Sequence, residues 1–267
     1  MRIKNVLPMA AFVAAALPLQ AQTTISLWNF NSNPADANTC TGLLTPSAGA
    51  GTVSLIGGVT STFAAGSPGD PASAGNDNSG LNLTSWATQG TGSGSSGLQV
   101  AASTAGFTDI SISLDFRQSG TVSRDFQLQV SYDGINFNNV SGGTASFGTV
   151  GSGNTLTSFT SGGLYVDNAG GGSQTFVQSV KYSFGTGSIY ENDPNFAFRW
   201  VAVFDSGTGG GTQYISSNAG TTAAYSTSGT GRFDMVSVIG TAVPEPSTLA
   251  LAGLSGLCVL VCRRQRK

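Results

Sequence analysis

The 267-residue chain contains no histidine, and this limits the chemistry that it can perform. Histidine is the usual general base near neutral pH and the commonest metal ligand. Ser–His and Cys–His hydrolases and zinc hydrolases are therefore excluded in their ordinary forms. A glycosidase needs only two carboxylates, about 5 to 10 Å apart. Asp109 and Asp115 share one strand face but are six residues apart, roughly 20 Å along the strand, so the sequence predicts no enzyme.

Aromatic side chains in polar segments could bind a sugar, because an exposed ring stacks on the apolar face of a pyranose. Such rings occur in Gly-rich surroundings at four positions: Trp86, Tyr165, Tyr214 and Tyr225. The structural alternative is that these rings form part of the core.

A short polar segment offers oxygen ligands of the kind that Ca²⁺ prefers. Its candidate ligands are Asp70, Asn76, Asp77 and Asn78. Their spacing matches no EF-hand, and the alternative is a set of solvated turn residues. No cofactor is predicted.

Three charged side chains lie within otherwise apolar strands. Arg124 is an even number of residues from Phe126 and Leu128 and so has the same parity along the strand. It would therefore point into the core with them, unless the strand begins after it. A buried arginine needs a carboxylate partner. We therefore expect Asp234 to pair with Arg124 or with Arg199.

The elements that must position these residues are strands. Apolar and polar residues alternate with a period of two and no helical period appears outside the two ends of the chain, so the expected fold is all-β. The expected class is a β-sandwich, jelly-roll-like, over residues 22–242. Strands are predicted at Thr23–Phe30, Thr52–Ile56, Leu98–Ala101, Asp109–Arg117, 125–132, Thr175–Phe184, Phe196–Phe204 and Arg232–Ile239. The segment from Asn31 to Gly97 is rich in loops. Trp28–Phe30 of the first strand is expected to pair with Arg232–Val236 of the last strand near the membrane end.

Charge and cysteine content narrow the class further. Residues 22–242 contain five basic and twelve acidic side chains, a net charge of −7. Nucleic-acid affinity depends on neutralising phosphates with Lys and Arg, so we expect no nucleic-acid partner. Cys40 is the one cysteine in this region, so no disulfide can form within it and the domain needs a packed core.

The N-terminus has the pattern of an export signal. Arg2 and Lys4 precede an apolar stretch from Val6 to Leu19, and a small residue follows at Ala21. Residues 1–21 are therefore predicted to be a signal peptide, with the mature chain beginning at Gln22.

The C-terminus has the pattern of a membrane anchor. An uncharged run from Leu249 to Cys262 is followed by the basic residues Arg263, Arg264, Arg266 and Lys267. Spanning a bilayer usually takes about 20 apolar residues, so we expect a short transmembrane helix. The alternative, a buried core helix, is disfavoured because the positive-inside rule would leave the basic end in the cytoplasm. Residues 22–242 are then expected outside the inner membrane.

Residues 243–267 resemble the PEP-CTERM protein-sorting domain: Pro244-Glu245-Pro246, then a short apolar segment, then an Arg-rich end. The resemblance implies that a transpeptidase of the exosortase type recognises this tripeptide and processes the tail, in bacteria that produce exopolysaccharide. The two prolines favour an extended segment that an enzyme can bind. The alternative is a Pro-rich hinge before a permanent anchor.

These features predict an exported protein, anchored in the inner membrane as a precursor and then retained in the envelope, at the surface or in the extracellular matrix. The leading function is a structural or adhesive module. The alternative is a carbohydrate-binding, lectin-like module of the exopolysaccharide matrix, and a carboxylate-dependent glycosidase comes third. The expected partners are exosortase, the membrane and, for the alternative, a polysaccharide.

Overall fold

A computed structural model describes residues 21–72, 77–150, 157–167, 175–218 and 221–244. The predicted signal peptide, the apolar run of the tail and its basic cluster lie outside these residues, apart from Ala21. Among the described residues, no helix is long and apolar enough to cross a membrane.

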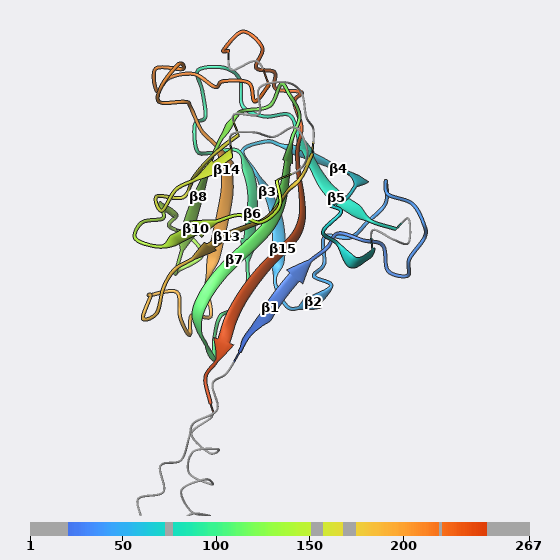
Figure 1. Cartoon of the computed structure of the whole chain (residues 1–267), viewed down its shortest axis with the longest axis vertical. Coiled ribbons are helices and arrows are strands. Elements are labelled where there is room, and N and C mark those ends of the chain that lie inside the picture. The colour runs from blue at the N-terminus through green and yellow to red at the C-terminus, as the bar shows by residue number, and fades with distance from the viewer. Residues whose placement is uncertain (1–20, 73–76, 151–156, 168–174, 219–220, 245–267) are drawn as a thin grey trace, which may run out of the picture.

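The described chain is an all-β sandwich of two sheets, which confirms the predicted class (Figure 1). The strands are β1 (Gln22–Trp28), β2 (Ala48–Gly49), β3 (Thr52–Ile56), β4 (Thr60–Ala65), β5 (Ser79–Thr84), β6 (Gly97–Ala101), β7 (Phe107–Gln118), β8 (Asp125–Ser131), β9 (Asn138–Asn139), β10 (Thr144–Ser146), β11 (Thr157–Phe159), β12 (Leu164–Asp167), β13 (Val177–Ser183), β14 (Ala197–Ala202) and β15 (Gly231–Ala242).

The eight-stranded sheet has the order β10-β13-β7-β15-β1-β2, and the β4–β5 hairpin joins it through β5 on β15. The seven-stranded sheet has the order β11-β12-β8-β14-β6-β3, with β9 on β8. Strands β6, β7, β8, β13, β14 and β15 alternate between the two sheets. Each sheet therefore has one face toward the other and one outer face.

The core lies between the two inner faces. Alternation along β7 turns Ile112, Leu114 and Phe116 inward, where all three are buried. The ring of Phe116 packs edge-on against Phe126 of β8, with centroids 4.8 Å apart, and against Trp200 of β14 at 5.7 Å. Aromatic contacts of this kind add about 0.5–1.5 kcal/mol each beyond the burial of their area. The core can therefore hold the sheets together without a disulfide.

The loop-rich region between residues 31 and 97 contains more pairing than its composition predicts. Strand β4 pairs with β5 from Thr60↔Thr84 to Ala65↔Ser79, and neither strand was expected. Strand β5 in turn pairs with the start of β15, from Gly231 to Phe233. Leu81 and Leu83 of β5 are buried in the core, but this alternation covers only two apolar residues and β4 is largely exposed or half-buried, which explains why the sequence gave a weak signal.

The first and last strands pair as predicted, but the position of the tail corrects one detail. Gln22 lies opposite Thr241, and Trp28 lies opposite Val236. The described chain leaves the sandwich at Ala242, beside Gln22, so both ends of the domain are at one pole (Figure 1). The segment at Trp28 is therefore at the far end of this pair, not at the end nearest the tail as we expected.

Candidate functional site

The four aromatic residues predicted to stack on a sugar belong to the core. Trp86, Tyr165 and Tyr214 are at most 3% exposed. Tyr225 is partly buried, its ring stacks on Tyr214 with centroids 4.7 Å apart, and its hydroxyl donates to Ala87 O at 2.7 Å. Three of the rings are buried and the fourth packs against one of them, so we correct the prediction: the structural alternative holds.

The predicted calcium ligands lie partly together. Asp70 Oδ2 accepts a 2.7 Å bond from Asn31 Nδ2, and Asn78 Nδ2 donates to Ser67 O at 2.6 Å. Asp77 Oδ1 accepts a separate bond from the backbone of the 31–41 loop. Asn76 lies outside the described residues. Within the described part of the chain, no three acidic or cysteine side chains form a set that could hold a metal by themselves.

A pair of buried aspartates lies beside Asp70 and Asn78 on the outer face of the eight-stranded sheet. Asp115 of β7 and Asp234 of β15 are directly opposite in the strand register, and they are 4% and 0% exposed. Ser67 lies between them: its backbone N–H donates to Asp234 Oδ2 at 2.6 Å and its hydroxyl donates to Asp115 Oδ2 at 2.5 Å. Like charges placed opposite each other are unfavourable in a sheet, so this arrangement needs a specific compensation.

Burial shifts the titration of this pair. Desolvation raises the pKa of Asp234 to about 8, although hydrogen bonds from the N–H groups of Ser67 and Met235 act in the opposite direction. The negative charges of Asp70 and Asp115 raise this pKa further. Desolvation also raises the pKa of Asp115 above its usual range.

The expected ion pair between Asp234 and an arginine is absent, which corrects that prediction. Strand β8 begins at Asp125, one residue after Arg124, so the guanidinium turns away from the core and binds Asp125 and Asp205 instead. Arg199 Nε donates to Gln99 Oε1 at 2.8 Å. The parity of Arg124 predicted that it needs a carboxylate partner, but it did not identify Asp125 and Asp205 as the partners.

The outer face of the seven-stranded sheet has a row of polar side chains that lie opposite one another on five strands. The register aligns Ser54 with Gln99, Gln99 with Arg199, Arg199 with Gln129, and Gln129 with Asn139. We call these five residues the polar row. Their outward parity can be read from each strand, but the alignment between strands could not be read from the sequence.

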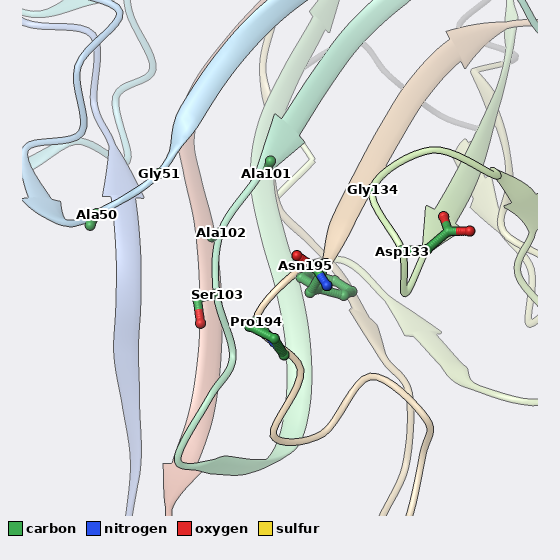
Figure 2. Close-up of a pocket in the computed structure, with 10 residues that line it drawn as sticks. Ala50, Gly51, Ala101, Ala102, Ser103, Asp133, Gly134, Pro194 and Asn195 are labelled. Atoms are coloured by element: carbon green, nitrogen blue, oxygen red, sulfur yellow. The ribbon is translucent and has the colours of Figure 1, made fainter.

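An aromatic ring and a hollow adjoin the polar row. The guanidinium carbon of Arg199 lies 3.6 Å from the ring centroid of Phe137, a cation–π contact. The hollow, of about 430 Å³, begins at Ala101, the next outward residue after Gln99 on β6. Figure 2 shows that the residues lining it lie mainly on loops next to the ends of strands. Its lining is Ala50, Gly51, Ala101, Ala102, Ser103, Asp133, Gly134, Pro194, Asn195 and Phe196.

The hollow combines a floor of small residues with a few polar groups at its rim. Asp133 accepts hydrogen bonds from the backbone N–H and the side-chain amide of Asn136 and from the N–H of Ile135, and these hold the pKa of its carboxyl far below its usual range. Together the hollow and the polar row offer amide, guanidinium and carboxylate groups on one open face. Such groups can donate to and accept from the hydroxyls of a polar ligand.

Comparison with known proteins identifies the tail. Residues 242–267 match the PEP-CTERM protein-sorting motif, so the chain carries a PEP-CTERM sorting tail. Val243, within this match, donates from its backbone N–H to Gly106 O at 2.8 Å, and Pro244 is exposed. No curated protein sequence matches the chain.

Solved structures give distant likenesses only. One is the xylan-binding CBM22-1 domain of Xyn10C from Paenibacillus barcinonensis, with 12% identity and a TM-score of 0.38, covering 85% of this chain and all of that one. Another is a putative sugar binding protein from Bacteroides thetaiotaomicron, with 11% identity and a TM-score of 0.36, covering 80% of this chain and all of that one.

In metal-free buffer with EDTA, we predict that the full chain in detergent loses thermal stability as the pH rises from 6 to 9. The folded chain keeps the proton of Asp234 up to a pKa of about 8, whereas the unfolded chain releases it near 4. The stabilisation is thus fully present below pH 4 and is lost as the pH rises through 8. Asp125, with a pKa of about 7, contributes in the same direction.

The matched variant is Asp234→Asn, because an amide replaces the neutral acid without taking a charge. We expect its melting temperature to fall several degrees less than that of the wild type between pH 6 and 9. Parallel curves of melting temperature against pH for the two proteins would contradict the assignment to Asp234.

Proposed function

We propose that this protein is exported, sorted by exosortase through its PEP-CTERM tail, and retained at the cell surface or in the exopolysaccharide matrix. The match of residues 242–267 to the sorting motif carries this proposal. The tail follows directly on β15, which ends at Ala242, and Gln22 lies beside that strand end. A membrane-held precursor would therefore present the opposite pole and both outer faces of the sandwich away from the bilayer.

The sandwich then acts as a structural or adhesive module rather than as an enzyme. Asp115 and Asp234 are close together, but they lie on neighbouring strands and both are buried. A glycosidase needs its two carboxylates on either side of a sugar that can enter between them. This pair therefore does not support the glycosidase hypothesis. The alternation of strands between the two sheets supports the finer description of the sandwich as jelly-roll-like.

A second candidate function is binding of a carbohydrate on the outer face of the seven-stranded sheet. The polar row and the adjoining hollow favour it, because they place amide and guanidinium groups beside small residues on an open surface. Sugars are recognised by such planar polar groups through paired hydrogen bonds to neighbouring hydroxyls. The polar row crosses five neighbouring strands, which suits an extended sugar chain better than a single sugar.

For sorting, we predict that replacing Pro244, Glu245 and Pro246 with alanine leaves export intact and abolishes tail processing. The leader and the tail act at separate steps, and alanines remove the extended Pro-Glu-Pro segment. Mass spectrometry of the C-terminus is the measurement. An identical C-terminus in the variant and the wild type would show that exosortase does not read this tripeptide.

For carbohydrate binding, we predict retention of the protein on at least one polysaccharide in a glycan array at millimolar sugar. Arg199→Ala should weaken that binding at least tenfold without lowering the melting temperature by more than a few degrees. Lys181→Ala is the control, because it removes one positive charge from the eight-stranded sheet. No binding to any glycan, or an equal loss in both variants, would reject the polar row as a sugar site.

A further inference from the structure

Two acceptor oxygens lie side by side in the interior, near Gly66 at the end of β4. A methyl group added at Gly66 would clash with both of them, overlapping Asn78 Oδ1 and lying 2.5 Å from Asp234 Oδ2, so the two oxygens lie close together beside this glycine. Asn78 is 8% exposed, and its Oδ1 has no hydrogen-bond partner within the described part of the chain. A buried unpaired acceptor is unfavourable, so a hydrogen donor or a cation is needed beside Asn78 Oδ1.

The orientation of the Asn78 amide is fixed by its other end. Its Nδ2 donates to Ser67 O at 2.6 Å. A flipped amide would place Oδ1 against that carbonyl oxygen and lose the bond. The carbonyl of Asn78 therefore points at Asp234, so either the proton of the Asp234 carboxyl or a cation must lie between the two oxygens.

Among the residues that the structure describes, no basic side chain forms an ion pair with Asp234. The groups that lower its pKa are the backbone N–H groups of Ser67 and Met235, while the nearby charges of Asp70 and Asp115 raise it. Arg232, the next outward residue on β15, donates instead to Ala65 O at 2.7 Å. The site therefore concentrates negative charge in the interior, which favours a cation.

Two irregularities in the strands hold this geometry. Met235, at the bulge between Asp234 and Ser237, has a φ of 47°, and its N–H donates to Asp234 Oδ1 at 2.7 Å. Ser179, at the bulge of β13, has a φ of 54°, and its N–H donates to Asp115 Oδ1 at 2.7 Å. Positive φ is costly for such residues and bulges of this kind commonly adjoin functional sites.

We propose that one divalent cation of the calcium type binds between Asp234 Oδ2 and Asn78 Oδ1. Ca²⁺ accepts carboxylate, amide and backbone carbonyl oxygens and completes its shell with water, which suits a site with few charged ligands. When the cation enters, the Asp234 carboxyl gives up its proton to the buffer and the carboxylate binds the metal. Of the calcium ligands predicted from the sequence, this site keeps Asn78, and it adds Asp234 of β15.

Occupancy would join β15 to the chain that covers the outer face of its sheet. Ser67 contacts both aspartates, and Asn31 connects Asp70 to the backbone of Ser79 with bonds of 2.7 Å each. A ligand that binds only the folded state stabilises it in proportion to its concentration over its dissociation constant. We therefore expect the cation to raise the melting temperature.

The test uses the full chain in detergent, stripped with EDTA and titrated at pH 6.5 with CaCl₂ up to 10 mM, with MgCl₂ in parallel. We expect Ca²⁺ to raise the melting temperature more than Mg²⁺ does. Asp234→Asn should weaken Ca²⁺ binding at least tenfold. The control is Asp109→Asn, which removes a carboxylate from β7 at a position where asparagine is tolerated. It should leave Ca²⁺ binding unchanged.

Asn78→Asp provides a second and opposite variant. The added carboxylate should lower stability in EDTA and tighten Ca²⁺ binding at least tenfold. The proposal is overturned if Ca²⁺ does not shift the melting temperature of the wild type, which would leave the proton as the only occupant. It is also overturned if Asp109→Asn loses as much binding as Asp234→Asn, or if Asn78→Asp does not bind Ca²⁺ more tightly.

Discussion

The opposition of Asp115 and Asp234 across the β7–β15 pair is the constraint on which the outer face of the eight-stranded sheet depends. These are neighbouring strands in the middle of the sheet, and two carboxylates with no basic partner would repel each other there. The chain responds by placing Ser67 over both, by aiming backbone N–H groups at them from two bulges, and by covering them with residues 66–72. The part of this face around Asp115 and Asp234 is consequently buried.

The outer face of the seven-stranded sheet is not covered in this way. Its polar row lies across five strands, and its hollow is open at one pole, where the strand ends of β6, β8 and β14 meet. The sorting tail begins at the same pole, after Ala242 (Figure 1). One sheet thus stabilises the domain on its outer side, while the other is free to meet a partner once the tail has fixed the orientation of the domain.

Parity explains what could be predicted from the sequence. In β7, apolar residues alternate with polar ones, and β14 is apolar on both faces except at Arg199, so the bounds of both strands were predicted to within two residues. The expected pairing with an arginine implied a buried Asp234, but the identity of its neighbours depends on the β7–β15 register and on the loop after β4, which are long-range features. For the four aromatic residues the local sequence was misleading. Their Gly-rich surroundings predicted exposed rings, whereas the loops fold the rings into or against the core.

A crystal structure of the domain grown with CaCl₂, with anomalous differences recorded, would test the central claim most directly, namely that the facing oxygens of Asp234 and Asn78 require a cation. The account predicts an anomalous peak about 2.3–2.6 Å from Asp234 Oδ2 and from Asn78 Oδ1. A structure without this peak, in which the two oxygens are about 2.5–2.8 Å apart as in a hydrogen bond from a protonated acid, would contradict it.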